Sequence, residues 1–224
     1  MSHTSKKRRN KKIINTTLVL LGLALIISFF VSTSDRTVDP ATFADVETYE
    51  LEPRIKGNEE ADISLVEYSD FQCPACKQAY PVVEQIVENY GNQFSFEYRH
   101  YPLRSIHPNA QLAAQAAEAA GVQGKFWEMH DMLFDNQSEW SRSFNPTKNF
   151  KDYAEELGLN VDRFEFDLKS DEVIAKVDAD EAEAQSLQLP GTPSFVVNGE
   201  VSTFEDFMAM LDLEQVDEST EDEA

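Results

Sequence analysis

Apolar and polar positions follow two different periods along the middle of the chain. Residues 63–69 (ISLVEYS) form a short, β-branched and mostly apolar run, which predicts a buried strand. From Ala79 to Tyr90 the apolar residues recur at steps of three and four, which predicts a helix that Gly91 can end. Residues 94–101 (FSFEYRHY) are aromatic and alternating, and they predict a second strand. The order so far is strand, helix, strand.

A long helical block follows this first unit. Throughout residues 104–189 the apolar positions keep a helical period, with breaks at Gly, Asn or Pro. A strand is then predicted at Ser194–Val197, and Asn198-Gly199 is a strong signal for a two-residue hairpin turn. Residues 202–205 match a capping box and should begin the last helix. The candidate helices of the block are 108–120, 125–134, 148–157, 163–168 and 171–187.

These elements predict an α/β domain over residues 61–212. An early strand–helix–strand unit and a late hairpin with a helix can share one sheet that has helices on both faces. The helical block, at about 104–189, would then be an insertion between the two halves of the sheet.

The amino-terminal segment has a pattern of its own. Ile13–Ser34 has no charged residue in 22 positions, enough for a helix to cross about 30 Å of hydrocarbon. The basic run KKRRNKK ends at residue 12 and should stay in the cytoplasm under the positive-inside rule. We therefore expect a cytoplasmic segment at 1–12, a single-pass signal-anchor in the cell membrane at 13–34, and an extracytoplasmic remainder. A signal peptide cleaved near residues 32–34 is the alternative.

Charge divides the chain sharply. Residues 1–34 hold six bases and no acid, whereas the remainder holds all 41 acids and 13 of the 19 bases, a formal net charge of −28. That negative field argues against nucleic acid as a partner, because binding to phosphates relies on clustered Lys and Arg. Residues 35–60 have no sustained period and are interpreted as a linker. Residues 213–224 are interpreted as a solvated acidic tail.

The two cysteines, Cys73 and Cys76, are the main candidates for chemistry. They are too few for a disulfide framework, and His100 and His107 lack the spacing of zinc ligands, so no metal site is predicted. A Cys-x-x-Cys at the start of a helix has a direct chemical use. Backbone N–H groups and the helix dipole stabilise a thiolate at the first position, and the thiolate is the nucleophile of disulfide exchange.

Residues 66–76 (VEYSDFQCPAC) resemble the active-site segment of DsbA-like thiol–disulfide oxidoreductases of the membrane-tethered type. That family carries a helical domain inserted into a thioredoxin fold. The resemblance therefore implies an α/β thioredoxin fold with its insertion at about 104–189, preceded here by one amino-terminal transmembrane helix. Residues 191–193 (GTP) resemble the family's cis-proline loop, which faces the cysteine pair.

Carried over position by position, the resemblance implies a role for each matching residue. Cys73 would be the nucleophile and Cys76 the resolving thiol. Thr192 and Pro193 would form the substrate-binding cis-Pro loop. Glu67 matches a buried acid that relays protons beneath the cysteines, although a charge at a solvated strand edge is the alternative for this position. No cofactor is implied besides the redox-active Cys73–Cys76 disulfide.

One departure from the family bears on redox strength. The dipeptide between the cysteines is Pro74-Ala75, whereas strongly oxidising members have a histidine there. Without an imidazole the Cys73 thiolate loses a stabilising partner, so its disulfide should be a weaker oxidant. Lys77 would compensate in part if its ammonium approaches Cys73.

The function that these features predict is a disulfide-donating oxidoreductase. Its substrates would be exported cysteine-containing proteins, and a membrane quinone-linked reoxidase of the DsbB or VKOR-like kind would restore its disulfide. A disulfide reductase or isomerase is the alternative within redox chemistry, although no segment suggests the dimerisation module that isomerases commonly need. A non-catalytic peptide-binding or chaperone module is the alternative from another class.

Overall fold

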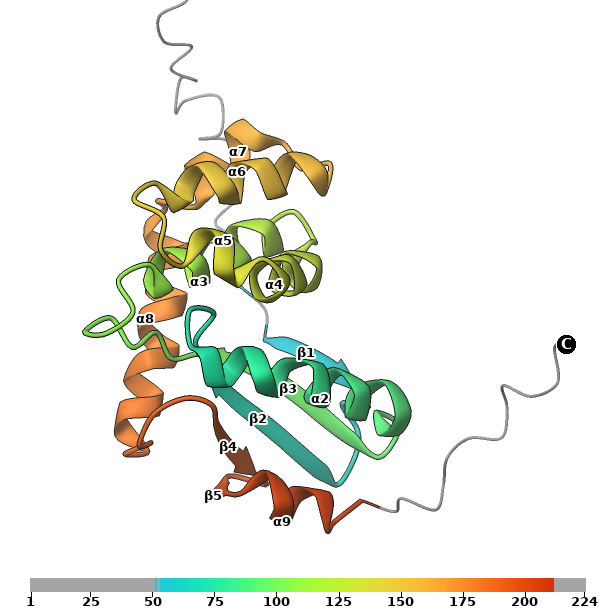
Figure 1. Cartoon of the computed structure of the whole chain (residues 1–224). Coiled ribbons are helices and arrows are strands. Elements are labelled where there is room, and N and C mark those ends of the chain that lie inside the picture. Colours follow the sequence, from blue (N-terminus) through green and yellow to red (C-terminus); the bar gives the residue numbers. More distant parts are fainter. Residues whose placement is uncertain (1–50, 52, 212–224) are drawn as a thin grey trace, which may run out of the picture. The chain divides into compact units, whose positions relative to one another are not determined.

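The computed structural model describes residue 51 and residues 53–211. Their strands form one five-stranded mixed sheet (Figure 1). The strand order is β1-β3-β2-β4-β5. Two central strands, β2 (Ile63–Ser69) and β3 (Phe94–His100), are parallel, and the other neighbouring pairs are antiparallel. The remaining strands are β1 (Arg54–Gly57), β4 (Ser194–Val197) and β5 (Glu200–Ser202).

Helix α2 (Pro74–Tyr90) connects the two parallel strands, and six further helices lie between β3 and β4 in the sequence. Figure 1 shows most of these six gathered beyond one end of the sheet, with α2 lying across the sheet. The last helix, α9 (Phe204–Met208), follows the hairpin. The six helices are α3 (Ala110–Gly121), α4 (Phe126–Asp135), α5 (Gln137–Trp140), α6 (Pro146–Glu156), α7 (Val161–Asp167) and α8 (Asp171–Ser186).

The alternation of β2 divides its side chains between two cores, as the period of a strand requires. Leu65 belongs to the larger core, together with Val83 of α2 and Phe207 of α9. Tyr68 points the other way, into a smaller core that includes Ala184 of α8. The sheet is therefore covered on both faces, and Glu67, which shares the face of Leu65, lies beneath α2.

The hairpin turn follows its sequence signal. Asn198 has φ 51° and Gly199 has φ 83°, the positive values that a two-residue turn of this kind requires at both central positions. The Asn198 side chain also accepts a hydrogen bond from the Ser64 backbone N–H at 2.8 Å, which fixes the turn against β2.

Two expectations from the pattern need correction, and one short helix was missed. Residues 54–57 of the expected linker form β1, which the pattern missed because this edge strand has only four residues and one large apolar side chain. The last helix is capped by Thr203, whose side chain accepts from the Asp206 N–H, one position later than the expected box. Helix α5 was not expected, because a four-residue helix is too short for a period to be visible.

Several expectations fall on residues that the structure does not describe. They are the cytoplasmic segment 1–12, the signal-anchor 13–34, most of the linker before residue 51, and the acidic tail 213–224. Across residues 53–211, none of the helices combines the length and the apolar character needed to cross a bilayer.

Candidate active site

Cys73 is the residue immediately before the first turn of α2. It is the N-cap, with extended backbone angles, and Pro74 takes the first helical position. Pro suits that position because its missing N–H would have no partner inside the helix. Cys76 lies one turn deeper and is fully buried, whereas Cys73 keeps 7% of its surface exposed. Both are free thiols in this structure.

The two sulfurs have opposite acidities. A hydrogen bond from the Cys76 thiol, with help from Thr192 and from the backbone N–H groups at the start of α2, outweighs partial burial and lowers the pKa of Cys73 to about 5. Burial raises the pKa of Cys76 far above its ordinary value, and the thiolate of Cys73 and the charge of Glu67 raise it further. At neutral pH the pair therefore holds one nucleophilic thiolate and one protonated thiol.

Glu67 is a buried acid on the sheet beneath this pair, with 3% of its surface exposed. Burial raises its pKa to about 7, and the charge of Glu84 adds to this while the neighbouring Ser69 opposes it. The prediction that Glu67 is buried and not a solvated edge charge is confirmed. A carboxyl with a pKa near 7 exists in both protonation states at neutral pH, which suits proton transfer.

The loop before β4 closes over Cys73. The Thr192–Pro193 peptide bond is cis, and the Thr192 carbonyl oxygen lies 3.5 Å from the Cys73 Sγ. This confirms the expected geometry of residues 192–193, although Thr192 lies 119 positions after Cys73 in the sequence.

Side chains that the sequence did not single out hold the segment before α2. Gln137 of α5 donates from its amide nitrogen to the carbonyl oxygens of Phe71 at 2.7 Å and Cys73 at 2.9 Å. The Asp70 carboxylate accepts from the backbone N–H groups of Gln72 and Leu103. The helical insertion thus positions Cys73 directly. The polar residues at positions 70 and 72, directly after a strand, could have indicated these contacts in the sequence.

Lys77 does not compensate for the histidine that is missing beside Cys73. Its ammonium donates to the Asp135 carbonyl oxygen at 3.1 Å, so it is held by the end of α4. The two histidines that were weighed as zinc ligands have separate partners: His107 Nδ1 lies 2.7 Å from Asp70 Oδ2, and His100 Nε2 lies 2.9 Å from Glu118 Oε1.

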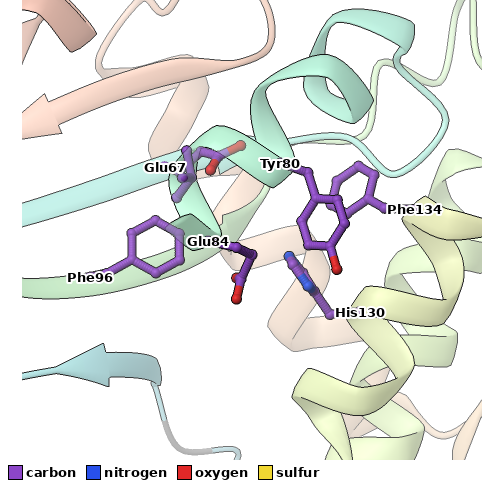
Figure 2. A pocket seen from close by; sticks show the side chains of 7 residues that line it. Glu67, Tyr80, Glu84, Phe96, His130 and Phe134 are labelled. Carbon is purple, nitrogen blue, oxygen red and sulfur yellow. The ribbon is translucent and has the colours of Figure 1, made fainter. Parts of the chain in front are cut away.

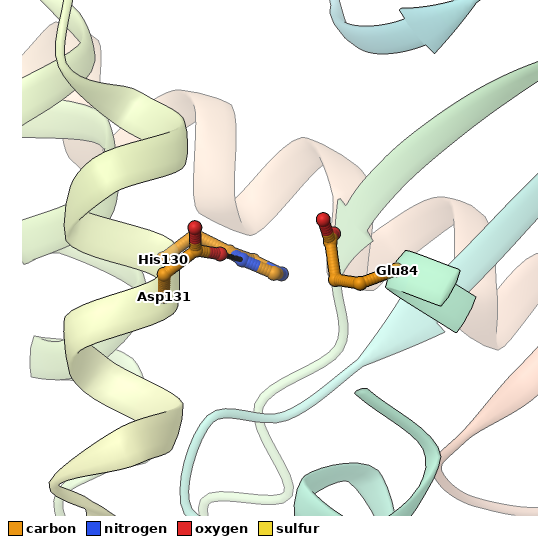
Figure 3. Close-up of side chains that lie close together, drawn as sticks. All are labelled: Glu84, His130 and Asp131. Carbon is orange, nitrogen blue, oxygen red and sulfur yellow. Dashed lines mark hydrogen bonds and ion pairs between the residues drawn. The ribbon is translucent and has the colours of Figure 1, made fainter. Parts of the chain in front are cut away.

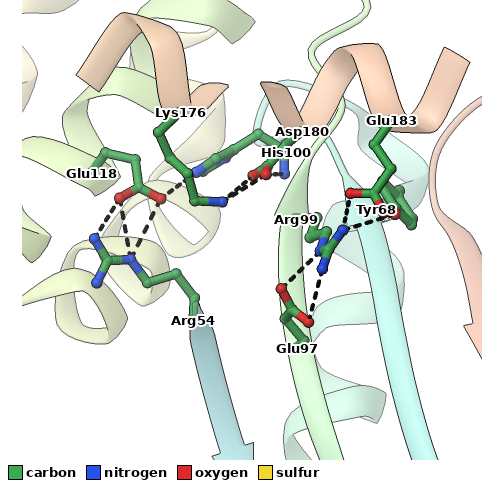
Figure 4. A network of polar contacts seen from close by, with 9 residues as sticks. All are labelled: Arg54, Tyr68, Glu97, Arg99, His100, Glu118, Lys176, Asp180 and Glu183. Carbon is green, nitrogen blue, oxygen red and sulfur yellow. Dashed lines mark hydrogen bonds and ion pairs between the residues drawn. The ribbon is translucent and has the colours of Figure 1, made fainter. Parts of the chain in front are cut away.

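A second buried acid, Glu118, lies on α3 in a network of ion pairs (Figure 4). Both of its oxygens accept from the Arg54 guanidinium, at distances of 2.5 to 3.4 Å. Burial alone would raise the pKa of Glu118, but hydrogen bonds and charge from His100 and Arg54 outweigh burial and lower this pKa to about 2. The His100 backbone N–H also donates to Asp180 of α8 at 3.1 Å. The network joins β1 and β3 to the helical insertion.

Glu67 also lines a narrow gap between the sheet, α2 and α4, which is too tight to hold a water molecule (Figure 2). Tyr80 and Glu84 line it from α2, and His130 lines it from α4. Figure 2 shows Tyr80, Glu84 and His130 gathered between α2 and α4, with Glu67 set apart from them on the sheet. The other lining residues are Val83, Phe96 and Phe134.

Within the described residues, one group has donor atoms close enough to be considered for a metal ion: Glu84, His130 and Asp131, within 4.8 Å of one another (Figure 3). These donors already have partners. Lys56 Nζ lies 2.7 and 2.6 Å from the two Glu84 oxygens, and His130 Nδ1 lies 2.8 Å from Asp131 Oδ1. A cation would have to displace the Lys56 ammonium, so this group is better described as an ion-pair cluster.

The geometry defines a class of protein. A cysteine pair at the amino end of a helix, facing a cis-proline loop on a mixed sheet with inserted helices, is the arrangement of a thioredoxin-like thiol–disulfide oxidoreductase. The profile of the thioredoxin family matches residues 50–213, so the chain belongs to this family.

Similar solved structures agree with that assignment. A thioredoxin-like oxidoreductase from Silicibacter pomeroyi is 29% identical, with a TM-score of 0.59, and the match covers 70% of this chain and 88% of that one. Bacillus subtilis BdbD shares the fold: it is 21% identical, with a TM-score of 0.59, and the match covers 67% of this chain and 84% of BdbD. Pseudomonas aeruginosa DsbA2 also shares the fold: it is 20% identical, with a TM-score of 0.57, and the match covers 70% of this chain and 92% of DsbA2. The predicted DsbA-like relationship and thioredoxin-like α/β fold are confirmed.

The chain also matches part of much longer curated proteins. It is 43% identical over 145 residues to the Na⁺/H⁺ antiporter NhaA 1 of Salinispora arenicola, a match that covers 65% of this chain and 21% of the antiporter. The NhaA antiporter of Herminiimonas arsenicoxydans is 39% identical over 145 residues, with 65% and 22% covered. The chain thus spans about a fifth of the length of these relatives.

Proposed function

We propose that this protein is a disulfide-donating oxidase for exported proteins, with Cys73 as the nucleophilic cysteine and Cys76 as the resolving one. The observation that carries the proposal is the opposite acidity of the two sulfurs, with the pKa of Cys73 lowered to about 5 and that of Cys76 raised. A sulfur that is stable as a thiolate is a good leaving group, so a disulfide formed through Cys73 passes readily to another thiol.

The exchange proceeds in two steps. A substrate thiolate attacks the Cys73 sulfur of the Cys73–Cys76 disulfide, the S–S bond breaks, and Cys76 leaves with the electron pair and takes a proton from Glu67. A second substrate thiolate then attacks the substrate sulfur of the mixed disulfide, and Cys73 leaves as a thiolate. The substrate has lost two electrons, and the cysteine pair has gained them.

The rest of the proposal concerns partners and place. The residues before the domain predict a signal-anchor at 13–34, so the domain would work outside the cytoplasm, where disulfides persist. A quinone-linked reoxidase of the DsbB or VKOR-like kind would accept the two electrons in the membrane. The cis-Pro loop, at Thr192 and Pro193, would hold the substrate backbone beside Cys73, and its 3.5 Å contact with Cys73 supports this role.

Trapping of substrates tests the proposal. A Cys76→Ala variant should accumulate mixed disulfides with exported proteins, because the resolving thiol is absent, whereas a Cys73→Ala variant should not. Non-reducing gels of cell extracts, compared with reduced samples, would detect these adducts. Equal trapping by both variants, or trapping by neither, would reject the assignment of the nucleophile.

A further inference from the structure

Two backbone carbonyls of the active-site segment share one donor. The side-chain amide nitrogen of Gln137 lies 2.7 Å from the Phe71 carbonyl oxygen and 2.9 Å from that of Cys73. A primary amide has two N–H bonds, so each carbonyl can receive one of them. The Cys73 carbonyl also accepts the first backbone bond of α2, from the Lys77 N–H at 3.1 Å. Gln137 therefore holds one peptide group before Cys73 and the peptide group directly after it.

The position of Gln137 is fixed by the core of the insertion. Gln137 is the first residue of α5 and is only 7% exposed. Trp140, at the other end of this short helix, is fully buried and packs against Phe150. Its ring nitrogen donates to the Leu133 carbonyl oxygen at 2.8 Å. Because a close-packed core resists movement of such a ring, α5 presents the Gln137 amide at a set place.

Gln72 gives the insertion a second hold on the same segment. Its amide nitrogen donates to the Ser141 carbonyl oxygen at 2.7 Å, and its amide oxygen accepts from the Asn109 backbone N–H at 2.7 Å. Ser141 directly follows α5, and Asn109 directly precedes α3. All three residues from 71 to 73 thus contact the insertion, and Gln137 is the side chain that bonds to the Cys73 backbone itself.

The backbone at Cys73 decides which donors reach its sulfur. The Cys76 thiol, then Thr192 and the backbone N–H groups of Cys76 and Ala75, lower the pKa of Cys73 to about 5 against the effect of burial. Free N–H groups at the start of a helix stabilise an anion only when they point at it from hydrogen-bond distance. A rotation of the peptide group after Cys73 would turn the sulfur relative to these donors. The stability of the thiolate therefore depends on what fixes that peptide group.

We propose that Gln137 is a positioning residue for the exchange reaction: by holding the Phe71 and Cys73 carbonyls, it keeps the Cys73 sulfur aligned with the N–H groups at the start of α2. Through Gln137, the inserted helices set how strongly the disulfide oxidises. The inference rests on the proposed function, because it assumes that the Cys73 thiolate takes part in exchange. Gln137 acts on this thiolate through the backbone.

Two substitutions separate this role from the general need of a buried carbonyl for a donor. Gln137→Met has nearly the same size and shape but no N–H group, so both carbonyls lose their donor. Gln115→Met is the matched control, because Gln115 is buried to a similar extent and its amide nitrogen donates to the Leu168 carbonyl oxygen at 3.1 Å. Each variant loses a buried hydrogen bond, but the bond of Gln115 lies within the insertion and away from the active-site segment.

The test measures the equilibrium of the full chain with glutathione at pH 7. Two glutathione thiols reduce the cysteine pair: the Cys73–Cys76 bond breaks, the S–S bond of oxidised glutathione forms, and the pair gains two electrons. Of the two glutathione protons, one goes to Cys76 and one to solvent, because Cys73 remains a thiolate at this pH. The equilibrium constant therefore reports how well the protein stabilises that thiolate.

We expect Gln137→Met to lower the equilibrium constant for reduction of the pair about tenfold, which is about 30 mV for a two-electron couple. The thiolate of the reduced form loses its alignment with the N–H donors, and one hydrogen bond contributes up to about this much. The ultraviolet absorption of the thiolate, followed against pH, should show a raised pKa of Cys73. Gln115→Met should change neither quantity, although both variants should unfold at a lower urea concentration.

Gln137→Asn is a milder variant for the case that Gln137→Met does not fold. It keeps the amide but draws it back by one carbon, so the equilibrium constant should change in the same direction by a smaller factor. Circular dichroism of each variant checks the fold before the redox measurement.

The outcomes distinguish the inference from the proposed function. If the folded variants of Gln137 keep the equilibrium constant and the Cys73 titration of the unmodified protein, Gln137 only satisfies buried carbonyls, and the inference is wrong while the proposed function stands. If the unmodified protein has a potential at or below that of thioredoxin, the proposed oxidase is wrong. A raised pKa of Cys73 in Gln137→Met would then still support the positioning role.

Discussion

Two acids with similar burial, Glu67 and Glu118, lie in regions of the molecule that shift their pKa values in opposite directions. Each has at most 3% of its surface exposed, yet the pKa of Glu67 is raised to about 7 and that of Glu118 is lowered to about 2. Beneath the cysteines, Glu67 has no basic side chain among the main influences on its pKa. At the junction with the insertion, Arg54 and His100 both contact Glu118.

The comparison shows that partners, and not burial alone, decide the charge of a buried acid. Desolvation raises the pKa of both residues, and only Glu118 has basic partners, Arg54 and His100, whose effect outweighs it. The difference suits two purposes. A fixed charge at Glu118 can hold β1, β3 and α3 together, whereas a carboxyl that changes its charge near neutral pH can serve the thiol of Cys76.

The largest expected effect concerns the fixed charge. Glu118→Gln leaves Arg54 and His100 without their shared partner, and breaking a buried ion pair in this way costs about 3–5 kcal/mol of stability. Urea unfolding at pH 7 measures the loss. The matched control is Glu128→Gln, in an exposed pair with Lys125, which should change stability by less than about 1 kcal/mol. Equal losses of stability in the two variants would show that the buried Glu118 ion pair matters no more for stability than an exposed pair.

The same residue predicts a pH dependence. Because the folded state lowers the pKa of Glu118 from 4.5 to about 2, its contribution is fully present above pH 4.5 and is lost as the pH falls towards 2. Stability of the Glu118→Gln variant should therefore change less over that range than stability of the unmodified protein.

A smaller effect of opposite sign is expected at Glu67. Its pKa is raised on folding, so the unfolded chain loses this proton first, and stability falls as the pH rises from 4.5 to 7. Glu67→Gln should therefore stabilise the protein by up to about 3 kcal/mol at pH 8 and leave it nearly unchanged at pH 4. Urea unfolding at the two pH values decides this. A stabilisation that is the same at both would show that ionisation of Glu67 is not its cause.

Local sequence patterns predicted much of the fold and of the candidate site. The strand at residues 63–69 and the helix after it have strong periods. Cys73, Cys76 and Glu67 fall within one continuous motif, so their proximity follows from neighbouring positions. Thr192 and Pro193 are distant in sequence and were placed beside Cys73 by resemblance to a known family.

Other parts depend on contacts that no local pattern contains. Arg54 and Glu118 are 64 positions apart, and Lys56 and Glu84 are 28 apart. β1 brings both basic residues to the sheet edge, and this strand was interpreted as linker because a four-residue edge strand carries little hydrophobic signal. Gln137 likewise reaches the Cys73 carbonyl from a helix too short to be recognised in the sequence.

The reduction potential of the Cys73–Cys76 pair tests the central claim most directly. The lowered pKa of Cys73, about 5, stabilises the reduced form and makes the disulfide a better oxidant. The pKa of Cys73 lies between the pKa values of the nucleophilic cysteines of thioredoxin, about 7, and of DsbA, about 3.5. Equilibration of the purified protein with glutathione buffers should give a potential between about −270 and −120 mV, the values of those two proteins. A potential at or below that of thioredoxin would contradict the oxidase and favour a reductase.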